Sequence, residues 1–163
     1  MKNETTGAEF ATLYDETDCN IMKVAEDSLD PRSDRVNELI LFAKEAAIKR
    51  IGIANCITFE KEAIMLEERL TEEGFKVVRA NCKLGKMARN EILPGYRGNS
   101  CNPAGQAKVL EEGQSELNLV LGLCVGHDMV FNAKSKAMTS TLIVKDRKYH
   151  HHVLEAFSMG VSF

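Results

Sequence analysis

The sequence lacks the short motifs that usually assign a function. Its five cysteines are widely spaced and no two of them form a Cys-x-x-Cys pair, so the common spacing of a metal-binding motif is missing. The first expected strand-to-helix turn, Asn55–Thr58, contains no glycine, and no Walker-type loop occurs in the chain. Glycine is needed in such a turn for the backbone to approach a pyrophosphate. The sequence therefore carries no nucleotide-cofactor motif.

An excess of positive charge and long apolar runs are also missing. The chain has 21 Lys and Arg residues against 24 Asp and Glu residues, a formal net charge of −3 at pH 7. Nucleic acid and membrane surfaces are therefore not expected as partners, which leaves an unidentified small ligand. No apolar run approaches the roughly 20 residues of a transmembrane helix, and the polar segment 1–7 lacks the apolar core of a secretory signal. We expect a cytoplasmic protein with reduced cysteines. The sequence predicts no oligomeric state.

The pattern of apolar residues alternates between the periods of helices and strands. This alternation predicts an α/β protein, a three-layer sandwich with a mainly parallel, Rossmann-like sheet of about four or more strands. The first two strands are expected to be parallel neighbours, because a helix connects them. No linker interrupts the pattern. We therefore expect residues 1–163 to form a single α/β domain that begins with a helical segment over residues 9–28.

Local patterns place the other elements. Asp30 followed by Pro31 predicts the start of a second helix. Thr58 is expected to cap a third helix that stops at Gly74. Strands are predicted at 50–56, 75–80, 117–123 and 139–144, and further helices around 86–92, from Pro103 onward, around 128–133 and at 149–157.

Four cysteines fall where predicted strands end or where a loop turns back: Cys56, Cys82, Cys101 and Cys124. Because a parallel sheet gathers its ligands at the carboxyl ends of its strands, these thiols are expected to meet in one site. Soft thiolates suit zinc or an iron–sulfur cluster. The leading hypothesis is a metal site built from these four cysteines, with His127 as a replacement or fifth ligand. Cys19 lies on a predicted helix and is expected to be structural.

A cysteine-dependent enzyme is the first alternative. The segment Gly122–Gly126 has the glycine-x-nucleophile-x-glycine form of a nucleophile elbow, with Cys124 at its centre. The following helix N-terminus would favour the thiolate, and backbone N–H groups would form an oxyanion site. In this hypothesis Cys124 attacks an acyl or amide group, with His127 or His151 as the base.

A small-ligand-binding module is the second alternative, with the polar residues Asn102, Gln106, His127 and Asp128 lining a pocket. The long loop between about residues 81 and 103 also carries basic residues, Lys83, Lys86, Arg89 and Arg97. These fit an anionic ligand, although basic residues in a loop are more commonly only solvated.

Six stretches together resemble a known family: Arg50–Cys56, Phe75–Val78, Cys82–Gly85, Cys101–Ala107, Leu117–Asp128 and Leu142–Arg147. The family is the uncharacterised prokaryotic domain of unknown function 1847, many members of which are labelled as metal-binding. The resemblance therefore implies metal binding here. Its members commonly begin with a compact cysteine-rich segment, where this chain has only Cys19, so that part of the family's metal site is expected to be absent. His151-His152-Val153 stands where the family has His-Asn-Pro.

Overall fold

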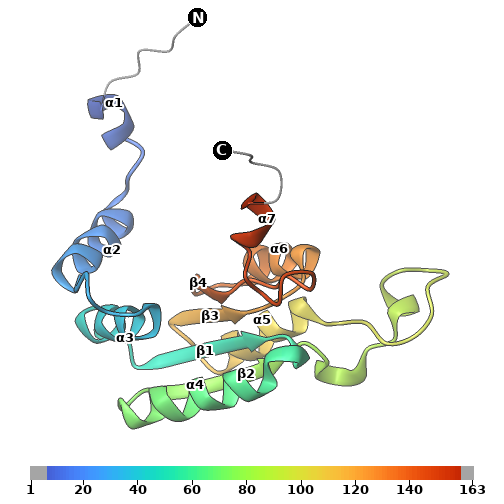
Figure 1. The fold of residues 1–163 in the computed structure, drawn as a ribbon. Helices are drawn as coiled ribbons and strands as arrows, with labels where there is room; N and C mark the ends of the chain where they lie inside the picture. The colour runs from blue at the N-terminus through green and yellow to red at the C-terminus, as the bar shows by residue number, and fades with distance from the viewer. Residues whose placement is uncertain (1–6, 159–163) are drawn as a thin grey trace, which may run out of the picture. The chain divides into compact units, whose positions relative to one another are not determined.

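The computed structural model describes residues 7–158 and divides the chain into two compact units, Met1–Ala47 and Ile48–Phe163. The first unit contains the helices α1 (Gly7–Ala11), α2 (Glu16–Asp27) and α3 (Arg35–Glu45). The second contains the sheet and its covering helices (Figure 1). Across residues 7–158, none of the helices combines the length and the apolar character needed to cross a membrane.

Two predicted helix boundaries in the first unit are wrong. The helical segment predicted over residues 9–28 is two helices, because Asp15 caps α2 in a capping box with Asp18. The Asp18 N–H donates to Asp15 Oδ1 at 2.9 Å, and the Asp15 N–H donates to Asp18 Oδ2 at 3.1 Å. The next helix begins after Asp34, not after Asp30. Asp34 Oδ1 accepts the N–H groups of Val36 and Asn37 at 2.9 and 3.0 Å.

The second unit is built on a four-stranded parallel sheet in the order β2-β1-β3-β4. The central strands are β1 (Arg50–Asn55) and β3 (Leu117–Leu121). Their residues are almost completely buried, as expected for strands covered on both faces. The flanking strands are β2 (Lys76–Asn81) and β4 (Met138–Ile143). The predicted parallel neighbours β1 and β2 pair from Arg50–Lys76 to Asn55–Asn81.

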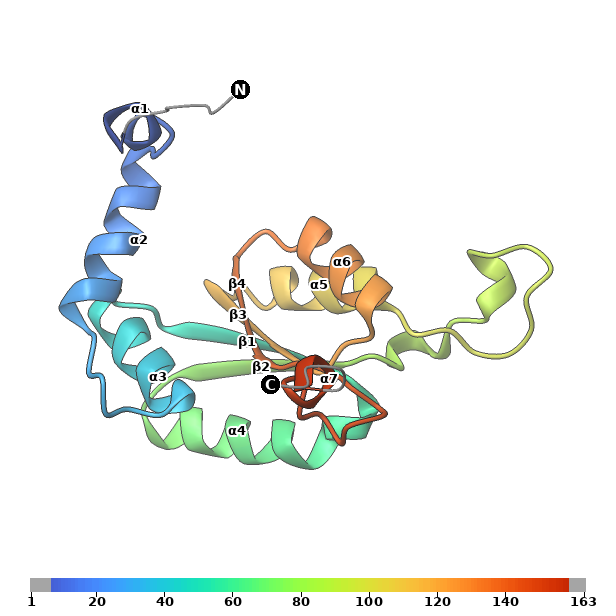
Figure 2. The same cartoon turned by 45° about the horizontal axis from the view of Figure 1, so that its top comes forward.

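Helices cover both faces of this sheet. Helix α4 (Glu60–Glu72) lies on one face, whereas α5 (Pro103–Glu112) and α6 (Val125–Lys134) lie on the other (Figure 2). The predicted three-layer α/β sandwich is therefore confirmed. Its core contains side chains of all three layers, among them Ile51, Ile53, Leu119, Ala63, Leu70, Leu110 and Phe131.

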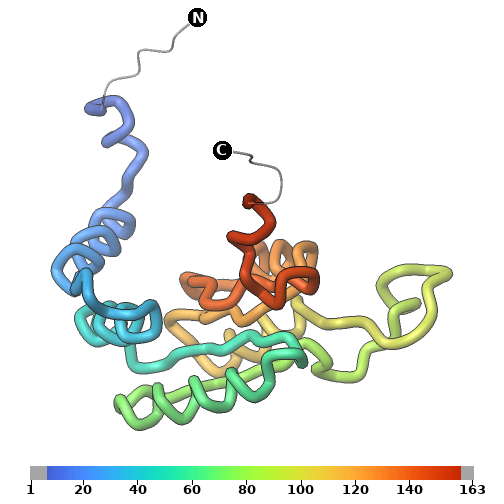
Figure 3. Tube along the Cα trace, in the orientation of Figure 1, coloured from blue at the N-terminus to red at the C-terminus, as the bar shows by residue number. Residues whose placement is uncertain are grey.

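The connections differ more from the prediction than the strands do. A 3-10 turn, Ile57–Phe59, precedes α4, and Phe59 rather than Thr58 is its N-cap. The helix predicted around 86–92 is two short 3-10 turns, Leu84–Lys86 and Arg89–Glu91, within a long excursion between β2 and α5 (Figure 3). The helix predicted over 149–157 is reduced to α7 (Glu155–Ser158), which follows turns through the preceding histidines.

One glycine allows the two central strand ends to approach each other. Gly122 follows β3 with φ +62°, and a Cβ placed there would overlap the ring of Phe59, which follows β1. We expect Gly122→Ala to lower the free energy of unfolding by roughly 2–4 kcal/mol, because it adds backbone strain to an overpacked contact. Urea unfolding would measure the loss.

The matched control is Gly74→Ala. Gly74 also has a positive φ, +92°, but nothing lies within 4 Å of the position that an alanine Cβ would occupy. Its alanine variant should lose only about 1 kcal/mol from backbone strain. Equal losses in the two variants would contradict the close packing of Phe59 against Gly122.

Candidate functional site

The sheet has one topological switch point, between the carboxyl ends of β1 and β3. The chain passes from β1 to α4 on one face, and from the neighbouring β3 to α6 on the other face (Figure 2). In open parallel sheets, the crevice at such a point is where ligands bind. Cys56 directly follows β1, and Cys124 is the N-cap of α6. The Cys56 N–H donates to the Leu121 carbonyl at 2.9 Å, which ties the two turns together.

Cys56 is buried and has a cationic partner. Lys145 Nζ lies 2.8 Å from Cys56 Sγ and 3.1 Å from Thr58 Oγ1. Burial by itself would raise the pKa of Cys56, but hydrogen bonds from Lys145 and the Thr58 N–H, with the charge of Lys145, lower it to about 7. A large fraction of this thiol is therefore ionised at neutral pH.

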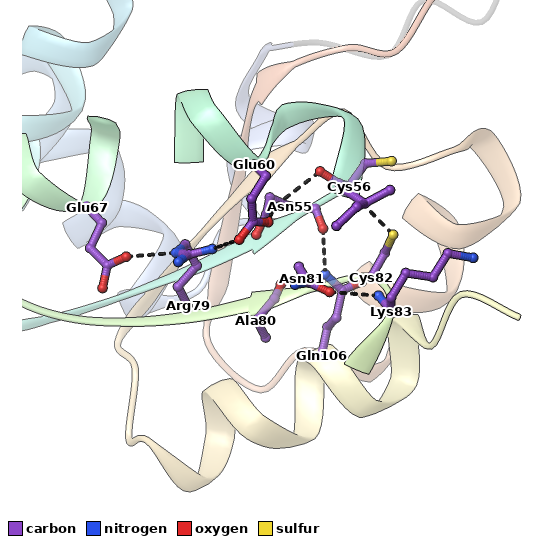
Figure 4. Close-up of polar contacts among 11 residues, drawn as sticks. Asn55, Cys56, Glu60, Glu67, Arg79, Ala80, Asn81, Cys82, Lys83 and Gln106 are labelled. Atoms are coloured by element: carbon purple, nitrogen blue, oxygen red, sulfur yellow. Dashed lines mark hydrogen bonds and ion pairs between the residues drawn. The ribbon is translucent and has the colours of Figure 1, made fainter. Parts of the chain in front are cut away.

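Cys82 follows the neighbouring strand β2, and its pKa is raised where that of Cys56 is lowered. Burial raises the pKa of Cys82 to about 12, even though the Ile57 N–H donates to its sulfur at 3.3 Å, and the nearby thiols of Cys101 and Cys56 add to the rise. Figure 4 shows Cys56 and Cys82 at the ends of their strands. Cys101 is partly exposed in the returning loop. Three of the four predicted cysteines are thus neighbours, and Cys82 is neutral at physiological pH.

Cys124 lies at the same sheet edge, after β3, with a different cationic partner. Arg147 donates from Nη2 to Cys124 Sγ at 3.1 Å. The sharp turn predicted for the elbow occurs at Gly122, whereas Cys124 itself is extended, with φ −69° and ψ 150°. The strained backbone of a nucleophile elbow is therefore not present at the cysteine.

Within residues 7–158, no group of three or more His, Cys, Asp or Glu side chains is arranged to hold a metal ion. Two of the four predicted cysteines have cationic partners instead, because Lys145 contacts Cys56 and Arg147 contacts Cys124. Ligation of zinc or an iron–sulfur cluster, by the set Cys56, Cys82, Cys101 and Cys124, stays a prediction.

The two histidines that could serve as bases have distinct surroundings. Burial and several positive charges lower the pKa of His127, in the first turn of α6; the charges belong to Lys83, Lys145, Arg147 and Arg89. His151 accepts a hydrogen bond at Nδ1 from the Asp146 N–H at 3.1 Å, and its ring packs edge-on against Phe59 at 4.6 Å between centroids. A catalytic role for either histidine stays a prediction.

The polar residues that were predicted to line a pocket have structural partners. Asn102 caps α5 by accepting the Gly105 N–H at 2.8 Å. Gln106 is fully buried and donates to the carbonyls of Asn55 and Ala80, at 3.1 and 2.7 Å, which joins α5 to the sheet. Asp128 accepts from Asn132 on α6 at 2.9 Å. These bonds explain the residue types without a ligand, and their binding role stays a prediction.

Sequence reasoning did not single out Lys145 and Arg147 as site residues. Both belong to the segment after β4, which folds back because Asp146 and His151 are joined by two hydrogen bonds, at 2.8 and 3.1 Å. Asp146 Oδ1 also accepts the N–H groups of Lys148 and Tyr149 at 2.9 and 3.0 Å. The available signal was their position, since basic residues directly after a strand lie at the ligand-binding edge.

A polar network supports the backbone of Cys56. Asn55 donates from Nδ2 to the Cys56 carbonyl at 3.1 Å and to Glu60 Oε2 at 2.8 Å (Figure 4). Arg79 pairs with Glu60 and, at 2.7 Å, with Glu67. Burial opposes ionisation of Glu60, but its bonds with Asn55 and Arg79 lower the pKa of this carboxyl.

The fold and the site define a Rossmann-like α/β protein with cysteines at its ligand-binding edge. Residues 2–142 match the family described as "Protein of unknown function (DUF1847)". The uncharacterised protein MJ0455 of Methanocaldococcus jannaschii is 40% identical over 130 residues, which cover 77% of this chain and 67% of that protein. This chain therefore belongs to the DUF1847 family, as its motifs predicted. No solved structure matches the chain.

We expect Arg79→Met to destabilise the protein by roughly 1–3 kcal/mol, because it leaves the half-buried Glu60 carboxylate without its cationic partner. Lys108→Met is the control, since it removes an exposed ion pair with Glu112 on α5 and should cost about 0.5 kcal/mol or less. Urea unfolding of both variants would compare them. Similar small losses would show that the network contributes little.

Proposed function

We propose that this protein is a cysteine-dependent enzyme in which the Cys56 thiolate attacks an acyl or amide group of a small substrate. The supporting observation is the 2.8 Å contact between Lys145 Nζ and Cys56 Sγ, at the switch point of the sheet. A nucleophilic cysteine needs a lowered pKa and a position at the ligand-binding edge, and Cys56 combines both. This assignment differs from the sequence-based enzyme alternative, in which Cys124 was the nucleophile.

Charge favours Cys56 over the adjacent Cys82 as the nucleophile. With a pKa of about 7, Cys56 supplies thiolate at neutral pH, whereas Cys82, with a pKa of about 12, does not. Cys124 is more exposed, and its bond with Arg147 makes it the second thiol to test.

The proposed reaction uses Lys145 in two ways. Its ammonium first stabilises the Cys56 thiolate, which adds to the substrate carbonyl carbon. The bond to the leaving group then breaks, and Lys145 donates a proton to that group. Water gives a proton to the now neutral Lys145 and cleaves the resulting thioester, which releases the acid and restores the Cys56 thiolate beside a charged Lys145.

Metal binding is the second candidate, because Cys56, Cys82 and Cys101 are neighbours at one sheet edge. Thiolate ligands need deprotonation, so a metal would have to overcome the raised pKa of Cys82. Elemental analysis of anaerobically purified protein tests this candidate. A bound metal at one equivalent that is lost in Cys82→Ala would favour it over the enzyme.

Alkylation with iodoacetamide tests the enzyme. We expect the rate at Cys56 to rise with pH around a midpoint near 7, with an absolute rate that its burial lowers. In Lys145→Met the midpoint should move up by about one pH unit or more, because the stabilising charge is gone. Peptide mass mapping gives the rate at each cysteine.

Lys148→Met is the matched control, because Lys148 lies three residues further along the same segment, with its Nζ over the Tyr149 ring. Its midpoint should equal that of the wild type. A Cys56 midpoint near 9 in the wild type, or the same midpoint in Lys145→Met, would contradict the proposal.

A further inference from the structure

Positive charge gathers around the switch point between β1 and β3. Lys145 and Arg147, from the segment after β4, contact the cysteines that flank the switch point. Lys83 directly follows Cys82 at the end of β2 (Figure 4). Arg89 belongs to the long excursion after β2, where it donates to the Asn99 carbonyl at 3.3 Å. Besides burial, the positive charges of these four residues all lower the pKa of His127, which indicates that they lie near its imidazole ring.

The carboxylates of this region are engaged elsewhere. Asp146 accepts backbone N–H groups of its own turn, and Asp128 accepts from Asn132. Within residues 7–158, none of the ion pairs joins Lys83, Arg89, Lys145 or Arg147 to a carboxylate. These bonds leave the charges of Asp128 and Asp146 in place, and the Cys56 thiolate is the anionic group that contacts one of the four cations, Lys145.

The class of ligand follows from the cations that keep no anionic partner within the described part of the chain. Lys145 contacts the Cys56 thiolate, which leaves Arg147, Arg89 and Lys83 for a ligand. Several cations favour a group with more than one negative charge, and arginine matches phosphate oxygens with paired donors. These features favour a phosphate group over a single carboxylate.

We propose that the switch point binds the phosphate group of a small phosphorylated substrate, with Arg147 as the main contact and with Arg89 and Lys83 as supporting cations. Lys145 remains with Cys56. The inference deepens the proposed function, because it rests on that function for the reacting group of the substrate. The binding of phosphate itself does not depend on thiol chemistry.

Calorimetric titration with inorganic phosphate, at pH 7.5 and constant ionic strength, tests the proposal. Arg147→Gln should weaken phosphate binding by roughly tenfold, because one charge-assisted contact is lost. Arg89→Gln should weaken it by a smaller factor. The control is Arg97→Gln, an exposed arginine of the same excursion that does not contribute to the charge at His127, and it should leave the affinity unchanged. Circular dichroism checks that each variant is folded.

Two further titrations identify the ligand class. Methyl phosphate should bind as tightly as inorganic phosphate if the site takes a phosphate ester, and acetate should bind much more weakly. The proposal is overturned if the wild type binds no phosphate, if acetate binds equally well, or if Arg147→Gln and Arg97→Gln behave alike. A Cys56→Ser variant keeps the two proposals separate. Phosphate binding that persists there supports the anion site, whatever the alkylation rates show about the enzyme.

Discussion

The parallel pairing of β1 with β3 is the constraint on which the candidate site depends. The two strands pair from Ile51–Leu117 to Asn55–Leu121, and the Cys56 N–H extends the ladder to the Leu121 carbonyl. Because the following helices leave on opposite faces, this part of the sheet edge is the switch point, where open parallel sheets bind their ligands. Phe59 packs where the missing side chain of Gly122 would lie, and the His151 ring packs edge-on against the same ring. One strand pair thus fixes the cysteines and also the segment that carries their cations.

The architecture could be predicted because it follows from apolar runs. Each of the four strands was expected within a few residues, since β1 and β3 are continuous apolar segments and a parallel sheet hides both faces. Helix starts were harder to predict. Asp30 and Asp34 both precede suitable residues, but Asp34 supplies the cap, while Asp30 accepts the Arg32 N–H in a local turn. Local preference does not choose between two acceptable caps four residues apart.

The cysteine positions of the site could be predicted from topology, but its charges could not. Strand ends identify Cys56, Cys82 and Cys124 from the sequence alone, because parallel strands end at one edge. Lys145 reaches Cys56 across 89 residues of sequence, through a turn closed by Asp146 and His151. Such a contact has no local signature. Gln106 was predicted to bind a ligand, but its buried amide bridges the carbonyls of two strands. The sequence does not distinguish a structural glutamine from a ligand-binding one.

The opposite pKa shifts of Cys56 and Cys82 give the edge a definite charge state. Both thiols are buried, so desolvation acts in the same direction on each, and the difference comes from the partner. Lys145 compensates the burial of Cys56, whereas Cys82 has no cationic partner among residues 7–158, and its interactions with Cys101 and Cys56 raise its pKa further. At a pH between these two pKa values, Cys56 is mainly ionised and Cys82 mainly protonated. A site with one thiolate beside a neutral thiol is suited to a single nucleophilic attack, whereas a four-thiolate metal centre would need every neighbour to lose its proton.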